Sequence, residues 1–164
     1  MENNCGPDMC VPCGDGLVNI RVGAIIIKGG KALMVKCQFA DYCYSIGGRI
    51  KFGETAETAV VREVEEETGV RMTVDRLGCV SEVYFLNDSP KAFGKPVYEL
   101  ALYFYMNVPE DFEPVTDHIG DGVERFQWVA ADDPVTLYPE FIREAIASPK
   151  PFVVFDARDD RRRQ

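Results

Sequence analysis

Three glutamates on one predicted helix are the residues of this chain best suited to chemistry. Residues 55–68 contain no Gly or Pro and are rich in Ala and Glu, so they predict a helix that Gly69 ends. At about 100° per residue, Glu63, Glu66 and Glu67 fall within an arc of about 100° on one side of this helix. No Lys stands three or four residues away to relieve their repulsion.

This grouping of carboxylates favours a divalent-metal site. Ala56 lies on the same arc and Val60 borders it, so we expect the carboxylates to face packed structure. Carboxylates in such a place need a counter-charge, and Mg²⁺ supplies one by binding carboxylates, water and substrate phosphates. The alternative is a solvated acidic helix face, which is the usual outcome for a Glu-rich helix. The one-sided grouping argues against that alternative.

The residues on either side of the helix start fit the same use. Gly47 and Gly48 allow backbone geometries and close approaches that other residues resist. Glu54 precedes the helix, where the positive end of the helix dipole favours an anion. Arg62 adjoins Glu63 and can hold carboxylates through a fork of hydrogen bonds.

The elements that must position these residues form an α/β pattern. Runs of β-branched and aromatic residues predict strands, and Gly29-Gly30 predicts a hairpin turn. Residues 139–147 predict a second helix from the spacing of their apolar residues. The expected strands are residues 18–28, 32–37, 42–46, 71–86, 97–108, 125–130 and 152–155. This order predicts one α/β domain with a mixed sheet.

The segment at residues 48–70 also resembles the Nudix box, G-x5-E-x7-R-E-U-x-E-E-x-G-U with U aliphatic. Every specified position matches, namely Gly48, Glu54, Arg62, Glu63, Val64, Glu66, Glu67, Gly69 and Val70. A chance match has a probability of about 10⁻⁹ per window at average residue usage. The surrounding order of elements is similar to that of the Nudix α/β/α sandwich with a mixed β-sheet.

The resemblance implies a hydrolase of the MutT-like superfamily that cleaves a nucleoside diphosphate linked to another moiety, X, with Mg²⁺ or Mn²⁺. The implied metal ligands are the carboxylates of Glu63, Glu66 and Glu67 and the backbone carbonyl of Gly47. Arg62 would orient the glutamates, and Glu54 would pair with Arg62. Water activated by the metal would attack a phosphorus atom.

A late loop supplies a further acid in some members of this family. The candidates here are Glu113 and Glu124, and we prefer Glu124 because similar members carry an acid just before the strand that holds the tryptophan, here Trp128. An exposed acid at a strand end is the alternative for Glu124. The aromatic residues that could stack on a base are Tyr84, Phe85, Tyr103, Tyr105 and Trp128, although most such aromatics belong to a core.

The substrate is left open by the sequence. The size of the chain is similar to that of compact members that act on nucleoside triphosphates or related small nucleotides, which we prefer. ADP-ribose, a nucleotide sugar or a dinucleoside polyphosphate is the alternative. A further alternative is a domain that senses a nucleotide without cleaving it. Such domains usually lack some of the specified residues of the Nudix box, and none is missing here. Related domains often form homodimers, and nothing in the sequence identifies an interface.

The two ends of the chain lie outside the resemblance. Residues 1–16, rich in Cys, Gly and Pro, predict a tail or a small knuckle before a domain at residues 17–156. Cys5, Cys10 and Cys13 have part of the spacing of a zinc knuckle, but zinc needs four ligands and no second CxxC exists, so reduced thiols are favoured. Residues 157–164 predict a charged, solvated and disordered tail.

Composition sets the outer limits on function. The 164 residues suit one domain. With 27 acidic against 18 basic residues, the net charge of −9 argues against nucleic acid as a partner. It leaves a phosphate-bearing substrate open if metal ions supply positive charge. No stretch has the ~20 apolar residues of a membrane span, and the N-terminus lacks a secretory pattern, so we expect a cytoplasmic protein.

Overall fold

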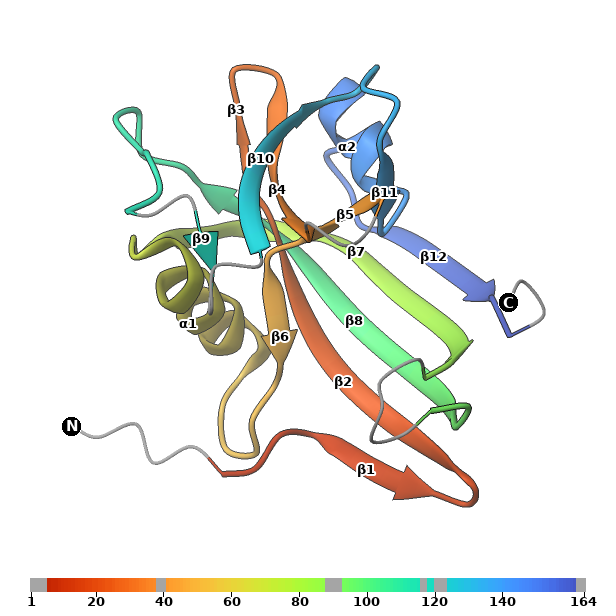
Figure 1. Ribbon diagram of the computed structural model, residues 1–164. Coiled ribbons are helices and arrows are strands. Elements are labelled where there is room, and N and C mark those ends of the chain that lie inside the picture. Colours follow the sequence, from red (N-terminus) through yellow and green to blue (C-terminus); the bar gives the residue numbers. More distant parts are fainter. Residues whose placement is uncertain (1–5, 38–40, 88–92, 116–117, 120–123, 162–164) are drawn as a thin grey trace.

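Two β-sheets and two helices make up the part of the chain that the structure, a computed structural model, describes (Figure 1). The described residues are 6–37, 41–87, 93–115, 118–119 and 124–161. Neither helix in these ranges has the length and apolar composition that crossing a membrane requires.

The first sheet has the strand order β1-β2-β8-β7-β12, with β6 paired to β2. The pairs β2/β8 and β7/β12 are parallel and the others antiparallel, so the sheet is mixed. Its strands are β1 (Cys10–Cys13), β2 (Gly16–Ile25), β6 (Gly47–Arg49), β7 (Thr73–Leu86), β8 (Pro96–Asn107) and β12 (Val154–Asp159).

The second sheet has the order β11-β5-β4-β10-β9, with β3 paired to β4. Only β5/β11 is parallel among its described pairs. Its strands are β3 (Ile27–Lys28), β4 (Lys31–Cys37), β5 (Tyr42–Ser45), β9 (His118–Ile119), β10 (Glu124–Ala130) and β11 (Thr136–Tyr138).

The long helix α1 (Ala56–Thr68) begins and ends where the sequence predicts. The Thr55 side chain accepts a hydrogen bond from the Thr58 amide and caps the first turn. Gly69, in the left-handed conformation, ends the helix with its amide bonded to the Glu65 carbonyl. The second helix, α2 (Ile142–Ala147), is shorter than the predicted range of 139–147.

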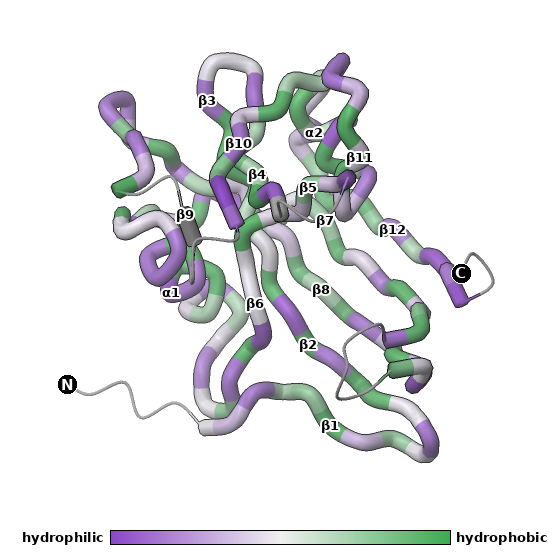
Figure 2. The backbone as a smooth tube through the Cα atoms, in the orientation of Figure 1, coloured by the Kyte–Doolittle hydropathy of each residue, from purple (hydrophilic) through white to green (hydrophobic). Residues whose placement is uncertain are grey.

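The two helices pack on two apolar clusters that the strands separate. Along β4, Leu33 and Val35 belong to the cluster with α1, whereas Met34 belongs to the cluster with α2. Strands buried on both faces explain the nearly continuous apolar runs of the sequence. Figure 2 shows hydrophilic residues on α1 and at the C-terminal end of β12. The predicted α/β/α layering is confirmed, with the strands divided between two mixed sheets.

At both ends of the described chain, the first sheet extends into segments that the sequence analysis placed in tails. Strand β1 pairs with β2 within the expected N-terminal tail, and β12 continues to Asp159 beyond the expected domain end. Three of the four β1 residues are exposed, and β12 alternates half-buried and exposed residues. Backbone pairing, not burial, holds these edges, so they leave little hydrophobic signal. Strands β6, β9 and β11 were missed because each has only two or three residues.

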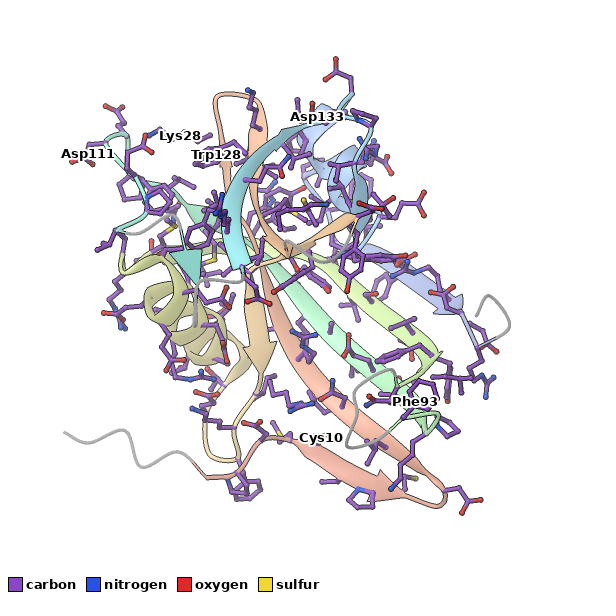
Figure 3. The ribbon with its side chains drawn as sticks, in the orientation of Figure 1. Cys10, Lys28, Phe93, Asp111, Trp128 and Asp133 are labelled. Carbon is purple, nitrogen blue, oxygen red and sulfur yellow. The ribbon has the colours of Figure 1, made fainter. Side chains whose placement is uncertain are left out.

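Strand β1 contains two of the three cysteines that have part of the spacing of a zinc knuckle. Cys10 and Cys13 stand three residues apart on one strand, so their side chains point to opposite faces (Figure 3 labels Cys10). As the strand stands, the two thiols therefore face away from each other. Cys5, the third expected ligand, lies outside the described residues.

Candidate active site

The guanidinium group of Arg62 holds together the loop before α1 and the acidic residues of the candidate site. Arg62 donates from Nε and Nη2 to the two carboxylate oxygens of Glu54, at 3.1 and 2.7 Å. Both side chains are buried, with 11% and 2% of their surface exposed. Glu54 also accepts a hydrogen bond from the Lys51 amide at 2.7 Å, so the pair fixes the loop before α1. The structure thus places Arg62 and Glu54 in direct contact.

The remaining nitrogen of Arg62 engages two of the three glutamates. Nη1 lies 2.7 Å from Glu63 Oε1 and 3.1 Å from Glu66 Oε2. The hydrogen bonds that Arg62 donates to Glu54, followed by its contact with Glu63, hold the pKa of Arg62 above its usual value despite burial. Glu63 is largely buried, but 55% of the Glu66 side chain is exposed, so only part of the expected burial of the cluster is found.

Glu67 differs from its neighbours because its hydrogen bond comes from an uncharged group. Its Oε1 accepts from the Gly47 amide at 3.2 Å. Burial raises the pKa of Glu67 to about 7; the Gly47 amide and Arg21 oppose this, while Glu63 and Glu124 add to it. A half-buried carboxylate among other carboxylates is a position that an added cation would stabilise.

Two glycines let α1 approach the neighbouring strands this closely. A Cβ on Gly48 would lie 2.3 Å from Glu63 Oε1. Gly47 has a φ of +146°, and its Cβ would lie 2.3 Å from the Val22 carbonyl oxygen. A side chain at Gly48 would push the Glu63 carboxylate away, and one at Gly47 would push β6 away from β2.

The residues at this place fit Mg²⁺ or Mn²⁺ in type. Carboxylates and a backbone carbonyl are the oxygen donors that hard divalent cations take, and a bound cation would oppose the effect of burial, which is the main cause of the raised pKa of Glu67. Within the described ranges, no three acidic, Cys or His side chains converge as they stand on a point that could hold a metal. Arg62 draws Glu63 and Glu66 together, and Glu67 faces Gly47 instead.

The two candidate late acids lie in different surroundings. Glu124 begins β10, and its charge adds to the rise in the pKa of Glu67 that burial mainly causes. Glu113 instead forms an ion pair with Lys28 at 3.6 Å (Figure 3 labels Lys28). Of the two acids, Glu124 is the one whose charge acts on Glu67, whereas Glu113 is paired with Lys28.

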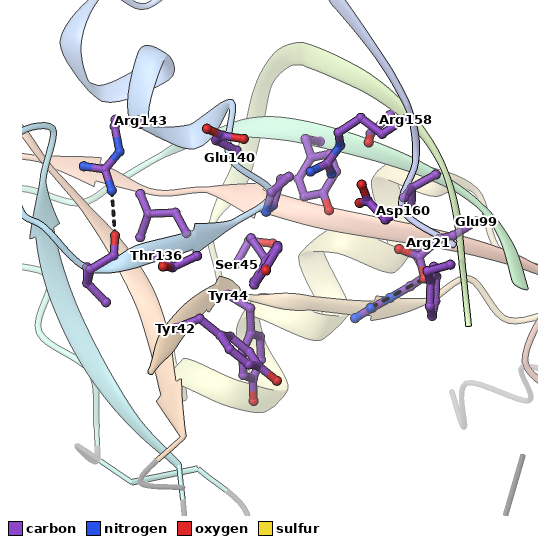
Figure 4. A pocket seen from close by; sticks show the side chains of 18 of the residues that line it. Arg21, Tyr42, Tyr44, Ser45, Glu99, Thr136, Glu140, Arg143, Arg158 and Asp160 are labelled. Carbon is purple, nitrogen blue, oxygen red and sulfur yellow. Dashed lines mark hydrogen bonds and ion pairs between the residues drawn. The ribbon is translucent and has the colours of Figure 1, made fainter. Parts of the chain in front are cut away.

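A cavity of about 770 Å³ adjoins the cluster (Figure 4). Arg21 lines it and donates from Nη2 to the Gly47 carbonyl at 3.3 Å, which links the cavity to the glutamates. Other walls come from both sheets and from the segment before α2, and include Tyr42, Tyr44, Ser45, Phe85, Glu99, Tyr103, Thr136, Arg143 and Arg158. Such a volume falls within the range of small-molecule sites.

Two of the five aromatic candidates line this cavity, Phe85 and Tyr103. The other three have partners elsewhere. Trp128 packs edge-on against Phe112, with ring centroids 6.3 Å apart. The Arg76 guanidinium lies 4.0 Å from the centre of the Tyr105 ring, and Tyr84 contacts Tyr98 with ring centroids 5.0 Å apart.

The sequence analysis missed two parts of the cavity wall. One is Arg21, which links the cavity to the glutamates, and the other is the pair of tyrosines on β5. Arg21 did leave a signal, because it is a charged residue within the otherwise apolar and polar-neutral run of β2. Tyr42 and Tyr44 were assigned to a strand without a role, and their rings lie 6.5 Å apart at the cavity wall. Only the fold shows that β2 and β5 border the same space.

A family model for the NUDIX domain matches residues 18–148, which is most of the chain. The chain therefore belongs to the NUDIX family. A segment of 54 residues is 43% identical to ADP-ribose pyrophosphatase of Methanocaldococcus jannaschii, and it spans 31% of this chain and 32% of that relative.

Solved structures of the same family share the fold. The mutator MutT protein from Bacillus halodurans superposes with a TM-score of 0.63 at 14% identity, covering 88% of this chain and 92% of its own. A MutT NUDIX hydrolase from Burkholderia pseudomallei gives a TM-score of 0.55 at 25% identity, with 77% and 96% covered.

Proposed function

We propose that this protein is a divalent-metal-dependent Nudix pyrophosphohydrolase that cleaves the diphosphate linkage of a small nucleotide, with a nucleoside triphosphate as the first candidate. The observation that carries the proposal is the cluster itself. One buried arginine holds Glu54, which precedes α1, together with Glu63 and Glu66 in the second half of that helix. Glu67 faces Gly47 beside a cavity of about 770 Å³. Membership in the NUDIX family supports it.

In this proposal Glu63, Glu66, Glu67 and the Gly47 carbonyl would hold Mg²⁺ or Mn²⁺. When bound, the metal would lower the pKa of a water molecule and neutralise charge on the phosphate oxygens. Arg62 acts through the glutamates by fixing their orientation.

Glu124 is the group of this chain that would accept a proton beside the cluster. Its charge already acts on Glu67, so it lies within reach of the same space. The cavity would orient the nucleotide and exclude bulk water from the reacting phosphate.

ADP-ribose or a nucleotide sugar is the second candidate substrate. The segment shared with an ADP-ribose pyrophosphatase supports it. So does the cavity, whose volume of about 770 Å³ can take a ligand larger than one nucleoside.

A substrate panel with Mg²⁺ tests the proposal and separates the candidates. Release of pyrophosphate or phosphate from a nucleoside triphosphate supports the first candidate, and release of a nucleoside monophosphate from ADP-ribose or a nucleotide sugar supports the second. Glu66→Gln and Glu67→Gln should lose the activity, whereas Glu57→Gln, an exposed residue in the first turn of the same helix, should keep it. Binding of nucleotides without cleavage of any panel member would instead favour a nucleotide-sensing domain.

A further inference from the structure

A row of hydrogen-bonded side chains runs along the cavity face of the first sheet and ends at the glutamate cluster. Asn19 on β2 donates to Glu99 Oε2 on β8 at 2.6 Å, and Arg21 Nη1 lies 3.8 Å from the same oxygen. Arg21 Nη2 donates to the Gly47 carbonyl at 3.3 Å, and the Gly47 amide donates to Glu67. Figure 4 shows Arg21 and Glu99 together on the cavity wall.

The contacts of Arg21 are long compared with those that hold its neighbours. Its two contacts measure 3.3 and 3.8 Å, whereas the Asn19–Glu99 bond measures 2.6 Å. A side-chain exposure of 37% for Arg21 against 12% for Glu99 makes Arg21 the accessible member of the pair. Arg21 can therefore change partners while Glu99 stays in place.

Two arginines stand side by side at this point of the sheet, and each has an acid nearby: Glu99 lies 3.8 Å from Arg21, and Asp8 lies 3.5 Å from Arg49. Arg49 stands directly opposite Arg21 in the β2/β6 ladder, and its Nε donates to Asn19 Oδ1 at 2.9 Å. Like charges directly opposite each other destabilise a sheet. Glu99 and Asp8 offset part of that repulsion. A phosphate at Arg21 would add a further anion, and a guanidinium fork suits a phosphate.

We propose that Arg21 binds a phosphate group of the nucleotide in the cavity, and that this exchange of partners releases the Gly47 carbonyl for the divalent metal. Glu99 and Asn19 are positioning residues that keep Arg21 at the boundary between cavity and cluster. The inference rests on the proposed function for the identity of the ligand. It adds that, without nucleotide, Arg21 competes with the metal for the Gly47 carbonyl.

Two separate binding measurements on the full chain test this exchange. The first is the affinity for α,β-methylene-ADP in EDTA, measured by calorimetry. Arg21→Ala should weaken it by about 10- to 100-fold, as expected for a lost charge-assisted hydrogen bond. The second is the affinity for Mn²⁺ without nucleotide, measured by electron paramagnetic resonance. The same variant should strengthen it by about 3- to 10-fold, because a nearby positive charge and a competing donor are gone.

Further variants separate this role from a structural one. Arg21→Lys keeps the charge without the fork and should recover part of the nucleotide affinity. Glu99→Gln should weaken nucleotide binding less than Arg21→Ala does. Glu82→Gln, on the opposite face of the same sheet, where Glu82 accepts from Tyr98, should change neither affinity.

The exchange is supported if Arg21→Ala weakens the binding of α,β-methylene-ADP and strengthens the binding of Mn²⁺. Loss of both affinities, or no change in either one, overturns it. The proposed function fails separately, on turnover: a wild-type protein that cleaves nothing in the panel but shows the opposite shifts refutes the hydrolase and leaves the role of Arg21 intact.

Discussion

The Glu54–Arg62 pair should be one of the strongest side-chain interactions in the molecule. It joins two buried side chains by two hydrogen bonds of 2.7 and 3.1 Å. Leaving one member of a buried ion pair without its partner costs about 3–5 kcal/mol. For a domain of 164 residues, each kcal/mol lowers the melting temperature by roughly 2–4 °C. Arg62 would keep Glu63 and Glu66 as partners, so the lower end of this cost applies. Glu54→Ala should therefore lower the melting temperature by roughly 6–12 °C.

A double-mutant cycle isolates the pair from the other contacts of Arg62. The variants are Glu54→Gln, Arg62→Met and the combination of both, and the free energy of unfolding is measured in urea. Glu54→Gln keeps an acceptor for the Lys51 amide, so the cycle reports on the ion pair. We expect a coupling energy of about 2–4 kcal/mol, because both hydrogen bonds are charge-assisted and shielded from water.

The matched control is the exposed pair of Arg71 and Glu65, at 2.6 Å with side chains 69% and 46% exposed. Its coupling energy should stay under about 1 kcal/mol. If the Glu54–Arg62 cycle gave no more than this control cycle, burial would not strengthen the pair, and the argument for Arg62 as the organiser of the glutamates would be refuted.

Three further predictions concern the carboxylates and the thiols. Glu67→Gln should stabilise the metal-free protein at pH 8 and remove part of the stability that wild type gains as the pH falls from 8 towards 5. The folded state takes up a proton on Glu67 near pH 7, before the unfolded chain does; calorimetry in EDTA measures both effects. Gly48→Ala should reduce turnover by about 100-fold with metal present, because its Cβ would displace the Glu63 carboxylate. Cys79, buried and with a pKa raised by burial to about 12, should react with iodoacetamide at pH 8 at least about 100-fold more slowly than exposed Cys13, as peptide mapping would show.

The parts of the fold that the sequence predicted well have strong local signals. Helix α1 could be placed to within one residue because Thr55 caps its start and Gly69 ends it. The buried strands β2 and β4 could be predicted from their runs of apolar residues. The pairing of β1 and the extension of β12 had no such signal, since main-chain hydrogen bonds at a sheet edge are compatible with almost any side chain.

In the candidate site too, contacts between residues close in the sequence could be predicted, and contacts between distant residues could not. Arg62 reaches Glu54, Glu63 and Glu66 across eight residues or fewer, so spacing along the chain could suggest the group. Asn19 reaches Glu99 across 80 residues, and only because β2 and β8 lie side by side and parallel. Which strand neighbours β2 depends on the packing of the whole domain, so a single sequence does not specify that contact.

Two arginines near the cluster meet different requirements, and their surroundings decide which can serve a substrate. Arg62 has 11% of its side chain exposed and contacts three carboxylates at 2.7–3.1 Å, so its charge is already used within the protein. A phosphate would have to displace those carboxylates and leave them buried without a counter-charge, at a cost of several kcal/mol. Arg21 is 37% exposed, and its longer contacts can be exchanged at little cost. In the proposed exchange, an acidic protein with a net charge of −9 would thus bind a phosphate through one weakly held arginine, while the strongly held one would keep the glutamates in place for the metal.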